Sequence, residues 1–460
     1  MLYAILKIIF KIALRIFFRR IEVQNRHLIP ATGPLLIASN HPNTFMDPIA
    51  VAAIFKQDVY FITKSTVFNS PFKKWLLQKA NMIPVYRRED GVVPATGNDA
   101  TFRKCTEYLL KKRTLIIFPE GNSFNERRLR PLKTGAARMA MVAESQANAG
   151  MEVKIIPIGV NYTDPTRFRS DLFINVGELI SIKDYTATAA QDSFKAAQDL
   201  TAELRRRLTD LIIVTETEEE DELVQQIELV YRADLIKDLG LEDRQEDKFV
   251  LTKSIAESIR YFQQQEPGRV EAIRKRMNRY FQNLNKLGLQ DKYLAHSQAN
   301  SNLFKNSFRT ILYLLAGFPV FIWGILTNYL PYYIPGKIAD ALTSEEEFRA
   351  PVMMTAGILS FGLVYVLEIA VIYAVTNSVL VTLVFLLSLP LSGFFALYYS
   401  NRLRNTQAYL KLFAFLYKNK PAINELLQQR REILIRLDKA RRIYLQRTSP
   451  TQDEAPVGHQ

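Results

Sequence analysis

Two patterns of apolar positions alternate along the first half of the chain. Short apolar runs with the length of a strand are separated by segments whose apolar positions repeat with helical spacing. The predicted strands are Leu35–Ala38, Val59–Thr63, Met82–Tyr86, Leu115–Phe118, Lys154–Asn161 and Leu172–Val176. The predicted helices are Pro48–Phe55, Pro71–Lys79, Ala100–Lys112 and Gly135–Ala147. This alternation predicts an α/β fold with a mostly parallel sheet.

The first 20 residues form a different pattern. Basic residues stand at every fourth position from Lys7 to Arg19, and nearly all positions between them are Ile, Leu or Phe. These charges interrupt the apolar core that a secretory signal needs, and a spanning helix would bury Lys11 at a cost of ~3 kcal/mol. We expect residues 1–20 to form an amphipathic helix on the membrane surface, with its basic side toward anionic headgroups. The alternative is a helix that packs on its own domain and leaves its lysines in water.

The second half is first charged and then apolar. Residues 191–304 follow a helical pattern, and we expect the acidic run Glu216–Glu222 to form a solvated helix start. Residues 305–400 hold three candidate membrane segments, 311–334, 353–375 and 379–399, with a turn at Asn377-Ser378. Residues 401–447 predict a basic helical tail, and the polar residues 448–460 are expected to be disordered.

The number of membrane crossings stays open. A cytoplasmic α/β half and a cytoplasmic basic tail require an even number of crossings. We expect the second and third segments to form a membrane hairpin, with the first segment partly inserted or re-entrant. In the alternative arrangement, the first and second segments are the two that cross the membrane. Glu368, the only charge in the hairpin, is costly in lipid. The alternative for all three segments is a set of buried core helices.

Composition narrows the classes of protein. The chain has 460 residues, a net charge of +14, a mean hydropathy of -0.05 and one cysteine. A single cysteine excludes a disulfide scaffold and a thiolate zinc site, and the four histidines are widely spaced. We expect no metal and no bound cofactor. The positive charge fits nucleic acid or an anionic membrane surface. Because the basic residues stand beside apolar helices, we expect a phospholipid membrane and no nucleic acid.

Candidate chemistry appears where predicted strands end. His41 follows the first strand and Asp47 stands shortly after it, a pattern that suits a general base oriented by a carboxylate. No Ser or Cys nucleophile motif stands beside them, which favours direct attack by a substrate hydroxyl. The alternative is that His41 caps a turn and Asp47 caps the following helix.

Cations gather at the neighbouring strand ends. Lys64 ends the second strand, Arg87 ends the third, and a Pro119-Glu120-Gly121 turn after the fourth leads to Lys133. Arg127, Arg128 and Arg130 stand in the same stretch. Singly, each is a solvated loop charge. Together they predict a site for a phosphate-bearing substrate.

These segments, taken in order, resemble the PlsC-like glycerolipid acyltransferase family. The similarity covers roughly residues 20–185 and rests on four motif regions. They are Asn40-His41 with Asp47, Lys64 with Ile83-Pro84-Val85-Tyr86-Arg87, Phe118-Pro119-Glu120-Gly121-Asn122-Ser123 with Pro131-Leu132-Lys133-Thr134-Gly135, and Ile156-Pro157-Ile158-Gly159-Val160-Asn161-Tyr162.

The resemblance implies a PlsC-like domain over residues 21–190 that moves a fatty acyl group from acyl-CoA or acyl carrier protein to a glycerol-phosphate hydroxyl. The acceptor would be glycerol 3-phosphate, dihydroxyacetone phosphate or a lysophospholipid. His41 would be the general base and Asp47 its partner. The substrate-binding residues would be Lys64, Arg87, Glu120, Gly121, Asn122, Ser123 and Lys133.

The sequence departs from the family pattern at two points. Five residues separate His41 from Asp47, where the family usually has four, and this longer spacer resembles the fungal-type branch. Asn122 stands where the family usually has Thr. The resemblance implies an integral membrane protein whose catalytic domain faces the cytoplasm, in a bacterial inner membrane or an endoplasmic-reticulum-type membrane. The alternative is a non-catalytic membrane-binding scaffold on a degenerate acyltransferase fold.

Overall fold

The structure is a computed structural model that describes residues 2–86, 99–147, 151–299, 303–418 and 420–448. Its contacts divide the chain into two units. The first comprises Met1–Val214 and Tyr332–Ser360, and the second comprises Thr215–Pro331 and Phe361–Gln460. Each unit is described by itself below.

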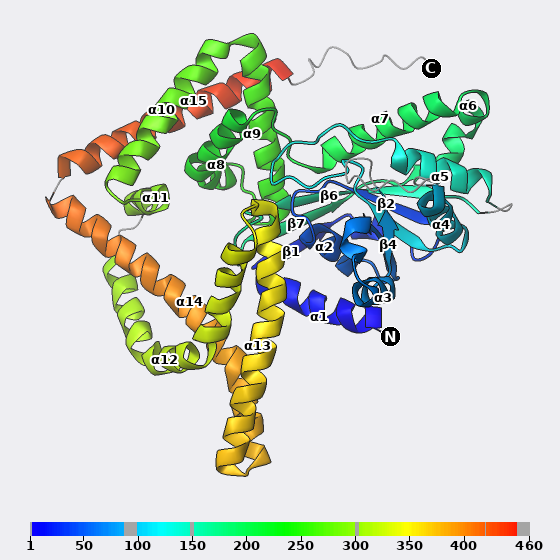
Figure 1. The fold of residues 1–460 in the computed structure, drawn as a ribbon. Helices are drawn as coiled ribbons and strands as arrows, with labels where there is room; N and C mark the ends of the chain where they lie inside the picture. The colour runs from blue at the N-terminus through cyan, green and yellow to red at the C-terminus, as the bar shows by residue number, and fades with distance from the viewer. Residues whose placement is uncertain (1, 87–98, 148–150, 300–302, 419, 449–460) are drawn as a thin grey trace, which may run out of the picture. The chain divides into compact units, whose positions relative to one another are not determined.

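The first unit is built on an 8-stranded sheet in the order β1-β7-β6-β2-β5-β3-β4, with β8 paired to β6 (Figure 1). The strands are β1 (Arg20–Gln24), β2 (Leu35–Ser39), β3 (Val59–Lys64), β4 (Met82–Val85), β5 (Thr114–Ile117), β6 (Lys154–Tyr162), β7 (Asp171–Val176) and β8 (Ile180–Ser181). Strands β2 to β6 pair in parallel, whereas β7 and β8 pair antiparallel with β6. The mostly parallel mixed sheet predicted from the sequence is confirmed.

Helices cover both faces of this sheet, as a parallel sheet requires. Successive β2 residues point to opposite faces, so Leu35 and Ile37 enter one core while Leu36 and Ala38 enter the other. Helices α1 (Leu2–Phe17) and α2 (Met46–Ile54) cover the first face. Helices α4 (Asp99–Leu110), α5 (Gly135–Ser145) and α7 (Ser193–Leu211) cover the second (Figure 1). Helix α3 (Pro71–Lys79) and the short α6 (Thr186–Gln191) also belong to this unit.

The amino-terminal segment is a helix, α1, that ends at Phe17. Leu14 and Phe17 are buried in the first core, and the Nζ of Lys7 donates to the Gln57 carbonyl at 2.8 Å. The exposed positions of α1 hold an isoleucine stripe together with Lys11 and Arg15; the stripe is Ile5, Ile8, Ile9, Ile12 and Ile16. Lys7 therefore contacts its own unit, whereas the exposed side of α1 carries both apolar and basic side chains.

The second unit contains a helical bundle. Helices α8 (Glu218–Asp238), α9 (Gln245–Gln265), α10 (Pro267–Lys286), α11 (Asp291–Ala299) and α15 (Lys420–Thr448) share one apolar core. Arg430 is buried in it and pairs with Asp291 at 2.9 Å, which keeps the buried charge satisfied. The acidic run begins α8, where the Thr217 side chain caps the helix.

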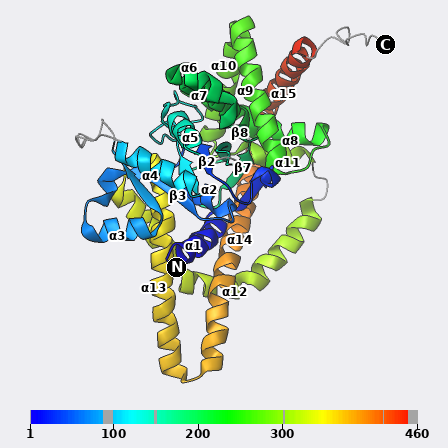
Figure 2. The same cartoon turned by 90° about the vertical axis from the view of Figure 1, so that its right-hand side faces the viewer.

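Among the described residues, three further helices are long and apolar enough to cross a membrane. They lie within α12 (Leu303–Leu342), α13 (Glu346–Thr376) and α14 (Val379–Lys418). The predicted turn at Asn377-Ser378 joins α13 to α14, and Figure 2 shows the two helices side by side there. Asn377 has a φ of 47°, a left-handed conformation that Asn tolerates better than most residues. Helix α13 starts seven residues before the predicted segment 353–375, with a polar first turn.

Candidate active site

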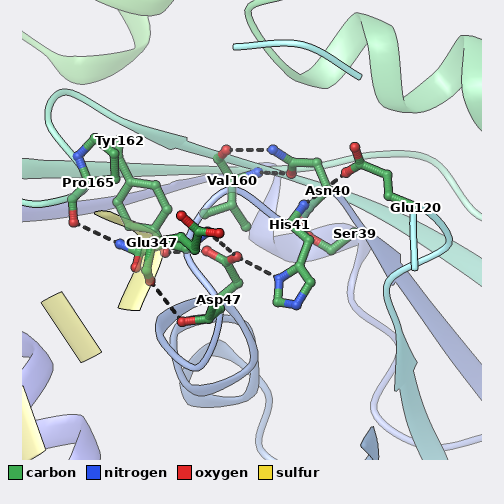
Figure 3. Close-up of polar contacts among 11 residues, drawn as sticks. Ser39, Asn40, His41, Asp47, Glu120, Val160, Tyr162, Pro165 and Glu347 are labelled. Atoms are coloured by element: carbon green, nitrogen blue, oxygen red, sulfur yellow. Dashed lines mark hydrogen bonds and ion pairs between the residues drawn. The ribbon is translucent and has the colours of Figure 1, made fainter. Parts of the chain in front are cut away.

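The site lies at the edge of the sheet where parallel strands end. Strand β2 pairs with β5 on one side and with β6 on the other, so the residues after these strands meet. His41 follows β2, Glu120 follows β5, and Tyr162 ends β6 (Figure 3). The sequence prediction that His41 and Glu120 share one edge is confirmed by this arrangement.

His41 and Asp47 form a direct pair. The His41 Nδ1 and the Asp47 Oδ2 are 2.8 Å apart, so an N–H at Nδ1 donates to the carboxylate. Asp47 is fully buried in the first turn of α2, where the positive end of the helix favours a carboxylate. The same Oδ2 accepts the backbone N–H of Asn43 at 2.7 Å. The spacer of five residues therefore folds into a turn that brings the two side chains together.

Tyr162 is the second side chain that holds Asp47. Its hydroxyl donates to the Asp47 Oδ1 at 2.6 Å (Figure 3). Burial, aided by the nearby Asp47 carboxylate, raises the pKa of Tyr162 well above its usual value, so the hydroxyl keeps its proton. The sequence analysis quoted Tyr162 only as the end of a motif. Its place at the end of the strand beside β2 was the available signal.

Two contacts hold His41 in place. The imidazole ring stacks on the Phe118 ring with centroids 3.9 Å apart, and the backbone carbonyl of His41 accepts the N–H of Phe124 at 3.1 Å. With Nδ1 turned to Asp47, the ring's Nε2 points away from that carboxylate (Figure 3). The side chain is 16% exposed, so part of the ring is accessible from solvent.

Glu120 joins the two loops of the site. Its Oε1 accepts the backbone N–H of His41 and its Oε2 accepts that of Arg130, each at 3.0 Å. Burial raises the pKa of Glu120, against the two backbone hydrogen bonds that favour the carboxylate. Gly121 follows with a φ of 86°, and a Cβ there would lie 2.9 Å from the Lys133 Nζ. The turn therefore needs glycine, and it places Lys133 beside it.

Asn40 anchors the start of the His41 loop to β6. Its Nδ2 donates to the Val160 carbonyl at 3.0 Å, and its Oδ1 accepts the Val160 N–H at 2.8 Å (Figure 3). A side-chain amide thus continues the hydrogen bonding between β2 and β6 by one step. This pairing fixes the chain direction immediately before His41.

The predicted cations fall into two groups. Lys133 and Arg130 lie in the loop that Glu120 ties to His41, and Asn122 and Ser123 are half-buried in the same loop. The guanidinium of Arg205 on α7 donates to the carbonyls of Leu129 and Arg130 and so supports that loop.

The other two predicted substrate-binding cations, Lys64 and Arg87, are not among the residues described in the loop after β5. Lys64 is exposed at the end of β3, which is separated from β2 by β5. Arg87 lies outside the described residues. Among the described residues, no three His, Cys, Asp or Glu side chains are grouped so that they could hold a metal ion.

Comparison with known proteins gives one family match. Residues 20–161 match the family model described as Acyltransferase. The chain is 24% identical over 294 residues to glycerol-3-phosphate O-acyltransferase 2 of Saccharomyces cerevisiae, covering 62% of this chain and 38% of that relative. It is 27% identical over 124 residues to a chloroplastic 1-acyl-sn-glycerol-3-phosphate acyltransferase of Brassica napus, covering 27% of this chain and 34% of that relative. The chain thus spans little more than a third of either relative.

Several solved structures are similar, and one of them is similar at low identity. It is described as the 1-acyl-sn-glycerophosphate (LPA) acyltransferase PlsC from Thermotoga maritima. The similarity covers 44% of this chain and 78% of that chain, with 20% identity and a TM-score of 0.32.

Replacing Glu120 by Gln tests its role as the link between the loops. One carboxylate oxygen would become an amide NH2 facing a backbone N–H, so a hydrogen bond is lost and two donors oppose each other. We expect Glu120→Gln to lower the free energy of unfolding of the first unit by about 1–3 kcal/mol. Glu126→Gln is the matched control, because Glu126 is exposed and pairs only with nearby arginines among the contacts described. Equal thermal unfolding of both variants and the wild type would contradict this role.

Proposed function

We propose that this chain, whose residues 20–161 form an acyltransferase-family domain, transfers a fatty acyl group to a glycerol-phosphate hydroxyl. The donor would be acyl-CoA or acyl carrier protein, and the acceptor glycerol 3-phosphate, dihydroxyacetone phosphate or a lysophospholipid. The printed names of the yeast and Brassica relatives support this class of acceptor. The observation that carries the proposal is the His41–Asp47 pair, with Nε2 turned outward at the edge of the sheet.

The geometry supports two successive proton transfers through His41. The Nε2 would take the proton of the acceptor hydroxyl as its oxygen attacks the thioester carbonyl carbon. Asp47 holds the ring through Nδ1 and stabilises the imidazolium that forms. As the tetrahedral intermediate collapses, the carbon–sulfur bond breaks and the thiolate takes the proton back from Nε2. The products are an ester and a free thiol, and His41 is restored.

The loop after β5 would hold the charges of the substrates. Lys133 and Arg130 would bind the phosphate, and Lys64, exposed at the end of β3, is a further candidate. The backbone N–H groups of His41 and Arg130 already donate to Glu120, and that of Gly121 donates to the Phe118 carbonyl. Hydrogen bonds to the oxyanion would therefore come from the side chains of Asn122 and Ser123.

Substituting His41 tests the mechanism directly. We expect His41→Ala to lower the turnover of labelled acyl transfer by at least about 100-fold, because the general base is lost. Asp47→Asn keeps the volume but removes the charge, so it should lower turnover less than His41→Ala. The measurement is the initial rate with purified protein in lipid, with thermal unfolding as the control for folding. Wild-type turnover in a folded His41→Ala protein would refute this mechanism, and the scaffold alternative would then be preferred.

We also propose that the chain is an integral membrane protein. Three helices have the length and composition of membrane spans, and the isoleucine stripe of α1 is exposed. In water such a stripe is unfavourable, whereas at the boundary of headgroups and acyl chains it is favourable. The catalytic unit would face the cytoplasm, where thioester donors are found, and α1 would lie on the bilayer surface beside it.

A fluorescent label on α1 tests this surface contact. Ile8 is 61% exposed, and Cys105 is buried, so Ile8→Cys provides one accessible thiol. In the intact chain reconstituted into anionic vesicles, we expect an environment-sensitive dye at residue 8 to shift to the blue, because α1 would insert about 5–10 Å. The control is Phe194→Cys, on exposed α7, which lies on the other side of the sheet (Figure 1). If the dye emission indicated an equally aqueous environment at residues 8 and 194, the placement of α1 on the bilayer would be contradicted.

A further inference from the structure

The loop between His41 and Asp47 is held by the beginning of α13. The Thr44 hydroxyl donates to the Glu347 carbonyl at 2.8 Å, a contact within the first unit. Thr44 has a φ of 22°, which non-glycine residues rarely adopt. An unusual backbone conformation at one residue of a catalytic loop needs a compensating contact. Thr44 makes that contact with a helix more than 300 residues later in the chain.

The Glu347 carbonyl lacks its usual partner within the helix. In an α-helix this carbonyl would accept the N–H of residue 351, but residue 351 is Pro351, which has none. Pro351 is also buried, so solvent does not readily replace the missing donor. Thr44 therefore supplies a hydrogen bond that the sequence of α13 has removed.

Three other contacts fix the same turn. The Asn125 Nδ2 donates to the Glu346 Oε2 at 2.8 Å, and the rings of Phe45 and Phe348 meet edge to face at 6.1 Å. Ala350 and Met354 are buried in the core that includes Met46 of α2. Both loops of the site, the one after β2 and the one after β5, thus bind the first turns of α13.

We propose that the start of α13 positions the catalytic pair, and that Thr44 is the positioning residue through which it acts. The His41–Asp47 spacer is one residue longer than the usual family spacer, and Thr44 lies in this longer turn. The extra length lets the loop reach α13 while Asp47 still reaches His41. Because α13 continues into a candidate membrane span, the catalytic loop is coupled to a helix that the bilayer orients. This inference rests on the proposed acyl transfer.

Thr44→Val tests this role, since it keeps the shape and removes the hydroxyl. We expect kcat to fall by about five- to tenfold, as for the loss of one hydrogen bond, with little change in KM. Thr44→Ser keeps the hydroxyl and should restore most of kcat. Thr201→Val is the matched control, because it also removes a hydroxyl that donates to a backbone carbonyl, that of Ala197 on α7. Thr44→Val and Thr201→Val with the same wild-type kcat would overturn the proposal.

Pro351→Ala provides a second test of the same contact. The new N–H at residue 351 would satisfy the Glu347 carbonyl, so the hydrogen bond from Thr44 would contribute less to kcat. We expect the fold-loss in kcat caused by Thr44→Val to be smaller in the Pro351→Ala background than in the wild type. Equal losses in the two backgrounds would show that the Glu347 carbonyl is not the partner through which Thr44 acts.

Hydrogen exchange separates failure of this inference from failure of the proposed function. The backbone N–H groups of Asn43 and Met46 donate within the loop, so they report its order. Thr44→Val should speed their exchange several-fold and Thr201→Val should not. If the wild type shows no acyl transfer but this difference in exchange appears, the contact between the loop and α13 is supported and the proposed acyl transfer is refuted. If acyl transfer proceeds and exchange is equal in all variants, the positioning role of Thr44 is refuted.

Discussion

The buried carboxylate of Asp47 is the constraint on which the site depends. A carboxylate with no exposed surface must be satisfied by donors, because water cannot reach it. Its three donors come from the loop after β2, through the His41 ring and the Asn43 backbone, and from the end of β6, through the Tyr162 hydroxyl. Satisfying this one group therefore fixes the loop after β2, the start of α2 and the end of β6 relative to one another.

A second buried carboxylate extends the arrangement across the sheet edge. Glu120 accepts backbone N–H groups from His41 and Arg130, so the loop after β5 is set relative to the histidine. These backbone contacts use both oxygens of the carboxylate, which explains why an acidic residue is suitable beside a site expected to bind phosphate. Lys133 lies beside Gly121 in the same loop, and the guanidinium of Arg130 pairs with the exposed Glu126 rather than with Glu120.

Much of the sheet could be predicted because its signal is local. Each of the six predicted strands, from Leu35 to Val176, is observed with its ends shifted by at most one residue. Their apolar runs are buried on both faces, and this leaves a clear pattern in the sequence. Strand β1 was not predicted, because its five residues alternate charged or polar side chains with only two apolar ones. Strand β8 has two residues, too few for any pattern.

The site was predictable only in part, for a related reason. His41, Asp47 and Glu120 stand close to strand ends and carry recognisable chemistry, so sequence reasoning could select them. The contacts of Tyr162 with Asp47 and of Thr44 with Glu347 join residues 115 and 303 positions apart. Such pairings depend on the order of strands and on helix packing, which no local pattern reveals. The spacer is one residue longer than the usual family spacer, and the 2.8 Å contact shows that Asp47 still reaches His41.

The central claim is that this sheet edge performs acyl transfer to a glycerol-phosphate hydroxyl. The most direct measurement gives the purified chain, in lipid, labelled acyl-CoA or acyl carrier protein together with a panel of acceptors. The panel holds glycerol 3-phosphate, dihydroxyacetone phosphate and several lysophospholipids. The account predicts a labelled ester with at least one acceptor and little product with plain glycerol, which lacks the phosphate. The absence of product from every pair of donor and acceptor would contradict it.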